Sequence, residues 1–509
     1  MTASLARRCA PSVVIASVIL VSTLLRADER LRSLAPQAVS AVDVSEDVEG
    51  RLAESGVVAA PISQRPNIVL IVTDDQRPDT IRSLGNAVIE TPHLDGLAAR
   101  GTAFTRAYAG YPICHVSRAQ LLTGCCAFKA LPQYPGGAID SSLATLAGTL
   151  RAAGYHTCYT GKWHNDGHPT QRGYSTTSGL FSSGGAKDFT QPESDERGRP
   201  LTGYRGWTFK NTANDPEPDK GIGLQPDNSR HVAEGAIQAL CNAPVKMPFF
   251  VHVNFAFPHD PRQWPAGMVD RYVPAKMVLP PNFAPQHPFE HGNLTGRDEL
   301  LLPRPLMEPA VREELARYYA MITDVDTQIG RILAALAAAE HAEDTLIVFT
   351  SDQGLALGSH GLLGKQNQYE HSIRSPLIIA GPGLPKNRRT AALVNLNDLF
   401  PTLCDLAGIA IPATVEARSL VPLLRGQTDR VHDFVTGCFT DTQRMICDTR
   451  WKLIRYPRIA REQLFDLQAD PHEQFDLSQN AEHRQIREDL KQRLDQWCRE
   501  HHDPAKAFP

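Results

Sequence analysis

Four runs of apolar residues constrain the fold of this chain more than any other feature. Residues 67–73 read NIVLIVT, and comparable runs lie at residues 249–255, 346–350 and 376–380. The runs are continuous rather than alternating, which is typical of strands buried on both faces of a parallel sheet. Helical patterns alternate with them, at residues 94–100, 143–153, 311–339 and 399–406. Strands that alternate with helices predict an α/β fold, with a large mixed, mostly parallel sheet flanked by helices.

The length of the chain and a change in its sequence pattern near residue 430 predict more than one domain. It has 509 residues, 42% of them apolar, which is enough to bury more than one core. We expect a main domain over residues 66–430, followed by a smaller C-terminal α+β domain over residues 431–509 with short strands and a charged helix. Residues 28–65 are polar and lack periodicity, so we interpret them as a linker. Two long stretches rich in Gly and Pro, residues 173–228 and 261–309, are expected to build a binding surface.

The first residues indicate export. Arg7 and Arg8 precede an apolar run over residues 10–25, and Arg26-Ala27 follows it as a cleavage site with a small residue, which together predict a signal peptide over residues 1–27. The run is only marginally long enough to span a bilayer, so an uncleaved signal that anchors the chain to a membrane is the less favoured interpretation. We therefore expect a periplasmic or extracellular protein.

The charge balance argues against nucleic acid as a partner. Lys and Arg total 52 against 56 for Asp and Glu, a formal net charge of −4. Such a chain has no global field that would steer it onto nucleic acid or an anionic membrane. An anionic substrate must be held by a few local cations. No sequence pattern indicates a particular oligomeric state.

The number of cysteines that follow the export signal is odd. Nine remain after Cys9: Cys114, Cys125, Cys126, Cys158, Cys241, Cys404, Cys438, Cys447 and Cys498. An exported chain with an odd count either leaves one thiol free or uses one cysteine for chemistry. The other eight can pair or stay buried as small apolar residues.

Polar side chains follow two of the predicted strands. Asp74 and Asp75 come directly after the first strand, and Asp352 and Gln353 follow the strand at residues 346–350. Because the carboxyl ends of strands line the ligand crevice of open α/β sheets, these groups can converge. Three carboxylates and an amide oxygen suit Ca²⁺ or Mg²⁺ and not zinc. The alternative is that each Asp only caps the turn or helix that follows it.

A second chemical signal lies in residues 111–124, which read YPICHVSRAQLLTG. Residues 117–122 are typical of a short helix that Gly124 ends, which would place Cys114 at or just before the helix N-terminus, where exposed N–H groups favour anions. Arg118 adds a permanent cation beside it. From this pattern alone, a buried cysteine near a helix cap is an equally good interpretation.

At this point the sequence resembles the type I sulfatases of the alkaline phosphatase superfamily. That family carries Cys-x-Pro-Ser-Arg followed by Leu-Thr-Gly, and this chain has Cys114, Ser117, Arg118, Leu122, Thr123 and Gly124 in register. The resemblance extends from about residue 66 to 480. It includes GKWH at 161–164, PHDP at 258–261, SDQG at 351–354, GSHG at 358–361 and DLFPTLCDLAG at 398–408. The resemblance implies an alkaline phosphatase-like fold and a catalytic sulfatase domain over residues 66–430.

The resemblance also implies a role for each matching residue. A maturation enzyme would oxidise Cys114 to formylglycine (3-oxoalanine), whose hydrate attacks sulfur and then expels sulfate. One calcium ion, or Mg²⁺ in its place, would be bound by Asp74, Asp75, Asp352, Gln353 and the modified Cys114. The other catalytic residues would be Arg118 and His164 at the gem-diol, Lys162 and Lys365 at the sulfate oxygens, and His259 at the leaving alkoxide. His360 and Asn165 are assigned to substrate binding.

The chain departs from the family pattern at three places. Val116 replaces the usual proline, Gln353 replaces the commoner Asn or His, and residues 165–167 read NDG where many relatives have Leu-Gly. We expect a sulfuric ester hydrolase that acts on a sulfated small molecule or glycan, with a sulfated carbohydrate as the favoured substrate. Two alternatives stay open: a phosphonate monoester or phosphodiester hydrolase of the same superfamily, and a non-catalytic binder of sulfated glycans if Cys114 is unmodified.

Overall fold

The structure is a computed structural model that describes residues 65–184, 193–194 and 201–505. The predicted signal peptide and nearly all of the predicted linker lie outside these residues. Within the described part of the chain, no helix is long and apolar enough to cross a membrane. Export and the domain boundary near residue 430 stay predictions.

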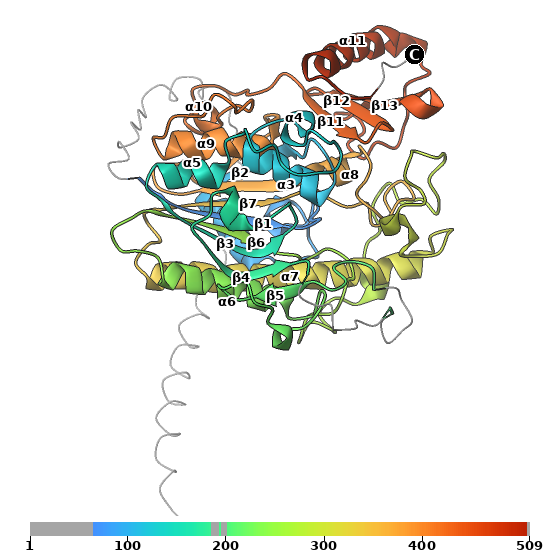
Figure 1. Cartoon of the computed structure of the whole chain (residues 1–509). Helices are drawn as coiled ribbons and strands as arrows, with labels where there is room; N and C mark the ends of the chain where they lie inside the picture. The colour runs from blue at the N-terminus through green and yellow to red at the C-terminus, as the bar shows by residue number, and fades with distance from the viewer. Residues whose placement is uncertain (1–64, 185–192, 195–200, 506–509) are drawn as a thin grey trace, which may run out of the picture. The chain divides into compact units, whose positions relative to one another are not determined.

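A mixed sheet forms the centre of the fold (Figure 1). In spatial order its strands are β10 (Val394–Asn395), β2 (Gly101–Tyr108), β8 (Arg374–Ala380), β7 (Thr345–Ser351), β1 (Asn67–Thr73), β6 (Phe249–Asn254), β3 (His156–Trp163), β4 (Thr176–Ser182) and β5 (Thr208–Lys210), with β9 (Arg388–Thr390) beside β2. Most neighbours run parallel, and β8 is antiparallel to both β2 and β7. The predicted mixed, mostly parallel sheet is confirmed.

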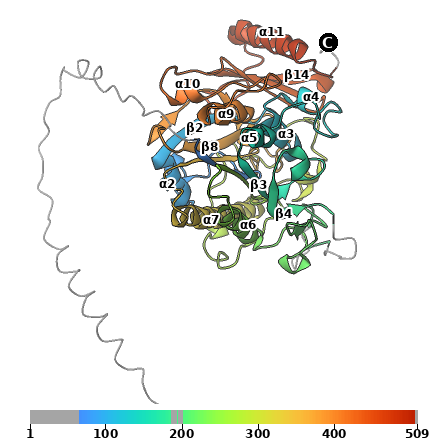
Figure 2. The ribbon, with the colours of Figure 1, turned by 60° about the vertical axis from the view of Figure 1, so that its left-hand side comes forward.

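Helices cover both faces of this sheet, as Figures 1 and 2 show. Ile68 and Leu70 of β1 pack into one core with α3 (Cys114–Thr123), α5 (Leu146–Ala152) and α9 (Leu399–Leu406). Val69 and Ile71 pack into the opposite core with α2 (Pro92–Arg100), α6 (Asn228–Cys241) and α7 (Glu308–Ala338). Successive side chains of a strand point to opposite faces, so a strand between two helical layers must be apolar at every position. That requirement explains the continuous apolar run.

A second, antiparallel sheet follows the main fold. Its strands are β11 (Val435–Phe439), β12 (Gln443–Cys447), β13 (Trp451–Tyr456) and β14 (Arg461–Asp466). One face packs on α11 (Arg484–Glu500) through Leu490 and Leu494. The other shares a core with the main fold that includes Tyr108 and Tyr369. The C-terminal α+β architecture that the short strands and charged helix predict is present.

Sequence patterns missed β2, β3 and β4, because glycine and polar residues interrupt their apolar positions. In β3 the glycine is required by the packing of the strand against its neighbour. Gly161 has a φ of 82° and sits at a register shift between β3 and β4, and a Cβ there would lie 1.9 Å from the backbone oxygen of Asn254. Only glycine permits so close an approach of β3 to β6. The next residue, Lys162, is fully buried.

Candidate active site

The two acidic strand ends meet at one edge of the sheet. Strands β1 and β7 are parallel neighbours, with Thr73 opposite Ser351, so Asp74 and Asp352 follow at the same level. One oxygen each of Asp74, Asp75 and Asp352 lies within 4.8 Å of the others, and all three side chains are buried. Asp75 has a left-handed φ of 66°, a conformation that Asp tolerates better than most residues. The predicted convergence of these carboxylates is present in the structure.

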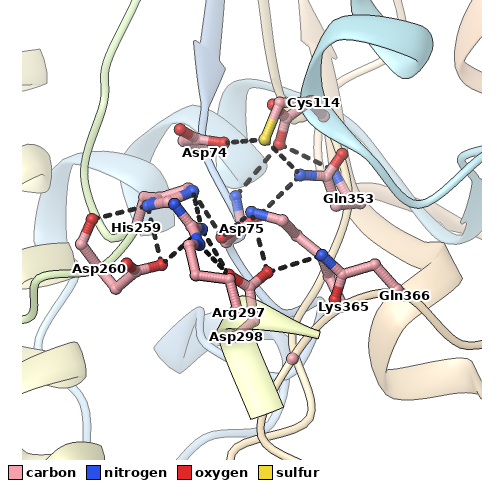
Figure 3. A network of polar contacts seen from close by, with 12 residues as sticks. Asp74, Asp75, Cys114, His259, Asp260, Arg297, Asp298, Gln353, Lys365 and Gln366 are labelled. Carbon is pink, nitrogen blue, oxygen red and sulfur yellow. Dashed lines mark hydrogen bonds and ion pairs between the residues drawn. The ribbon is translucent and has the colours of Figure 1, made fainter. Parts of the chain in front are cut away.

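Cys114 begins helix α3, and its side chain points at this acidic group (Figure 3). Its Sγ lies 3.1 Å from Asp74 Oδ1 and accepts a hydrogen bond of 3.2 Å from Gln353 Nε2. Gly124 ends the helix with a φ of 67°, as the sequence predicts. Burial, reinforced by the charge of Asp74, raises the pKa of the Cys114 thiol far above its ordinary value. The thiol is therefore protonated at neutral pH and, unmodified, is a poor nucleophile.

Three buried cations face the carboxylates. Lys162 pairs with Asp74, Lys365 Nζ lies 2.7 Å from Asp75 Oδ2, and Arg118 Nη2 lies 2.8 Å from Asp352 Oδ2. Their side chains are 0%, 3% and 5% exposed respectively. Buried cations that converge on one group of carboxylates can bind an anion that displaces part of these ion pairs.

The carboxylates do not ionise equally. Burial opposes ionisation of Asp74, but Lys162, with His259, Arg118 and Lys365, outweighs it and holds the Asp74 pKa well below its ordinary value. Burial raises the pKa of Asp75 to about 7, with Lys365 opposing and Asp74 and Asp352 adding to the rise. Burial and the nearby Asp74 raise the pKa of Asp352 to about 6. Without a cation between them, these groups resist simultaneous ionisation.

The donor set fits a hard divalent cation. Gln353 Nε2 donates to Asp75 Oδ1 at 2.6 Å, whereas its Oε1 is buried without a hydrogen-bond partner among the described residues. Rotation of this amide by half a turn would direct the unpaired oxygen toward the carboxylates, which is favourable only when a cation separates them. Three carboxylates and one amide oxygen are ligands that calcium prefers.

His164 and Asn165 lie beside the start of α3, where both contact His115. The His164 ring packs edge-on against His115 and Trp207, with centroids 5.8 and 5.3 Å apart. Asn165 Nδ2 donates to the backbone oxygen of His115 at 2.7 Å. Burial, with the nearby Lys162, holds the His164 pKa well below its ordinary value, so the imidazole is neutral and can accept a proton.

His259 follows β6, and one of its ring nitrogens lies within 4.8 Å of both Cys114 Sγ and an oxygen of Asp74. Its Nδ1 lies 2.7 Å from the backbone oxygen of Asp260, which requires Nδ1 to carry the proton. Its Nε2 therefore faces the site, 3.7 Å from Asp75 Oδ2. Burial, with Lys365, keeps the His259 pKa well below its ordinary value in this state. A bound anion would add negative charge and favour protonation at Nε2.

The structure does not bring His360 to this group. Its ring stacks on Tyr369 with centroids 3.9 Å apart, and its backbone N–H donates to the backbone oxygen of Asn282 at 2.7 Å. Burial, with His287 nearby, lowers its pKa to about 3. These contacts place His360 between the main fold and the C-terminal sheet, and its assignment to substrate binding has no support from the described contacts.

Five residues of the site are not among those predicted from the sequence: Tyr204, Asn254, Asp260, Arg297 and Asp298. Asn254 ends β6 and accepts a 2.6 Å hydrogen bond from Arg118 Nη1, so the strand-end signal that indicated Asp74 would have found it. Asp260 lies within the PHDP motif. The others come from the two long stretches rich in Gly and Pro, which carry no periodic signal. Tyr204 donates to Asp74, and its ring centroid lies 5.1 Å from Lys162 Nζ and 4.7 Å from that of His259.

The described cysteines form no disulfide. All nine that follow Cys9 have free thiols in the described part of the chain. Several of them, such as Cys125 and Cys404, are fully buried in the apolar core. Those two therefore pack as small apolar residues, one of the two outcomes that the cysteine count allows.

Comparison with known proteins identifies the family. The profile of the Sulfatase family matches residues 66–409, and that of "N-sulphoglucosamine sulphohydrolase, C-terminal" matches residues 358–500. An arylsulfatase of Clostridium perfringens is 30% identical over 83% of this chain and 92% of its own length. An N-acetylglucosamine-6-O-sulfatase of Bacteroides thetaiotaomicron is 26% identical over 87% of this chain and 88% of its own length. The solved phosphonate monoester hydrolase of Agrobacterium radiobacter has a TM-score of 0.70 at 25% identity, covering 86% of this chain and 96% of that one. The chain thus belongs to the type I sulfatase family of the alkaline phosphatase superfamily, and it is a sulfuric ester hydrolase.

Proposed function

We propose that the chain hydrolyses the sulfate monoester of a sulfated carbohydrate, with Cys114 as formylglycine and one calcium ion in the acidic group. The placement of Cys114 carries the proposal. Its Sγ lies 3.1 Å from Asp74 Oδ1, at the first residue of α3. The raised pKa of its thiol agrees with a nucleophile that must be made by oxidation. The similarity to an N-acetylglucosamine-6-O-sulfatase supports a sugar as the leaving group.

Calcium would be held by Asp74, Asp75, Asp352, Gln353 and the modified Cys114, with magnesium as the alternative ion. When bound, it polarises the sulfate and neutralises charge that develops on it. Formylglycine hydrate supplies one hydroxyl to attack sulfur and a second whose collapse releases sulfate. A maturation enzyme is therefore a necessary partner of the chain.

The surrounding residues would bind the sulfate, orient the gem-diol and transfer protons. Lys162 and Lys365 would bind the sulfate oxygens, because cleavage of such esters passes through a loose transition state that positioned cations stabilise. Arg118 fixes the orientation of the Asp352 carboxylate and would orient the gem-diol. His164 would accept the proton that lets the gem-diol collapse, and His259 would protonate the leaving oxygen through Nε2.

The mass of the tryptic peptide 107–118 tests this proposal. Protein produced with a formylglycine-generating enzyme should contain a peptide that is lighter than the cysteine form and reactive toward hydrazides. Cys114→Ala should lose turnover of 4-nitrophenyl sulfate, whereas Cys158→Ala, which changes another buried cysteine in β3, should keep it. Full activity in protein whose Cys114 is an unmodified thiol would refute the formylglycine nucleophile. Binding of sulfated sugars without turnover would favour the non-catalytic binder.

A second candidate function is phosphonate monoester or phosphodiester hydrolysis. The structural similarity to a phosphonate monoester hydrolase favours it specifically. Initial rates on a sulfate ester and a phosphodiester of the same phenol separate the two activities. We expect a higher kcat/KM on the sulfate ester, and the opposite ranking would make the phosphodiester the primary substrate.

A further inference from the structure

Arg297 lies beside His259, Asp260 and Asp298 in Figure 3, and its side chain is far more exposed than those of the two lysines of the site. It is 43% exposed, against 0% for Lys162 and 3% for Lys365. Its Nη2 lies 3.4 Å from His259 Nε2, the atom that would face the leaving oxygen. Arg297 therefore lies on the more exposed side of His259, the side toward which we expect the leaving group to extend.

Two buried carboxylates fix the orientation of this guanidinium. Nε donates to Asp298 Oδ1 at 2.7 Å, and Nη2 donates to Asp260 Oδ1 at 3.1 Å. The side chains of Asp298 and Asp260 are 3% and 5% exposed. Nη1 makes no hydrogen bond to any residue that the structure describes. The carboxylates thus hold the plane of the guanidinium and leave one of its nitrogens free to donate, which is the arrangement of a pre-oriented anion-binding arginine.

We propose that Arg297 binds an anionic substituent of the leaving group, so that the preferred substrates carry a second negative charge beside the ester that is cleaved. The substituent is a sulfate or a carboxylate, since either matches the guanidinium donors. This inference rests on the proposed function, because it takes His259 to mark the leaving-group side. The same charge disfavours a cationic leaving group.

A purely structural role makes a different prediction. If Arg297 only ties residues 297–300 to the segment after β6, its loss disturbs all substrates alike. A role in recognition changes the ranking of substrates according to the charge on the leaving group. The sign of that change, and not the size of any single loss, distinguishes the two roles.

The test measures calorimetric Kd values in a Cys114→Ala background, where no turnover interferes. The probes are glucosamine 2-N,6-O-disulfate, glucuronate 2-sulfate, N-acetylglucosamine 6-sulfate and choline sulfate. The dianionic probes are glucosamine 2-N,6-O-disulfate and glucuronate 2-sulfate. Adding Arg297→Gln should weaken the binding of one or both by about tenfold relative to the binding of N-acetylglucosamine 6-sulfate. The affinity for choline sulfate should rise relative to that for N-acetylglucosamine 6-sulfate, whose leaving group is uncharged. The dianionic probe that loses more identifies sulfate or carboxylate as the recognised group.

Arg271→Gln is the matched control, because Arg271 is 45% exposed, pairs with Glu90 and makes the same charge change. It should leave the ranking of the probes as in the parent, and Arg297→Lys should restore part of the preference for dianionic probes. Uniform losses on all probes, or no preference for dianionic probes in the parent, would overturn the proposal. The Kd ranking does not depend on turnover. If the protein that keeps Cys114, produced with a formylglycine-generating enzyme, fails to hydrolyse 4-nitrophenyl sulfate, that result would instead count against the proposed function.

Discussion

Calcium binding should release protons, and the number released should depend on pH. In the metal-free site the pKa of Asp75 is raised from 3.8 to about 7 and that of Asp352 to about 6, mainly by burial. For Asp75 the rise of about three units corresponds to about 4 kcal/mol of unfavourable free energy when the group ionises in the folded, metal-free protein. A bound divalent cation offsets that penalty by its own charge, and it needs both groups ionised.

The sign of the effect follows from the raised pKa values. In the unfolded chain Asp75 ionises near its ordinary value of 3.8, so the metal-free fold loses stability as pH rises from about 4 through 7. Calcium restores this stability, and its stabilising effect should be largest at about pH 8. Apparent calcium affinity should fall about tenfold per pH unit below pH 7, and more steeply below pH 6 where both carboxyls are protonated.

Titration calorimetry in buffers of different ionisation enthalpy measures the proton release directly. We expect close to zero protons at pH 8, about one at pH 6.5 and nearly two at pH 5. Asp75→Asn should remove one of them. Asp326→Asn is the control, because burial raises the Asp326 pKa to about 6 but its carboxylate binds the N-terminus of α2 and not the acidic group. A calcium affinity that is constant from pH 8 to pH 5, without proton release, would refute the reasoning.

Three further predictions concern single residues of the site. His259→Ala should reduce kcat/KM strongly on sugar sulfates and weakly on 4-nitrophenyl sulfate, whose leaving group needs no proton; equal losses would exclude the leaving-group role. Tyr204→Phe removes the phenol that donates to Asp74 but keeps the ring beside Lys162, so kcat/KM on 4-nitrophenyl sulfate should fall about tenfold, and an unchanged value would show that this hydrogen bond is dispensable. Gly124→Ala places a Cβ at a φ of 67° and should lower the free energy of unfolding by about 1 kcal/mol or more, measured by urea denaturation; unchanged stability would contradict the need for glycine there.

Local patterns account for the parts of the fold that the sequence predicts. The predicted strand at residues 67–73 is β1 with the same bounds, and the helix predicted at residues 399–406 is α9. β1 is buried at every position and α9 at every position except Asp405, and the apolar residues that produce this burial are visible in the sequence. In β3 and β4 glycine and polar residues interrupt the apolar run, so those strands are recognised only once their neighbours are in place.

For the site, the sequence by itself determined the groups that follow strands or lie in compact motifs. Asp74, Asp75 and Asp352 follow from strand ends, because the topology of a parallel sheet carries its carboxyl ends to one edge. Only the tertiary structure decided that Tyr204 and Arg297 join them and that His360 does not. Tyr204 contacts Asp74 across 130 residues of chain and Arg297 contacts His259 across 38. Such contacts depend on how long irregular segments pack against the finished sheet, and no local periodicity encodes that packing.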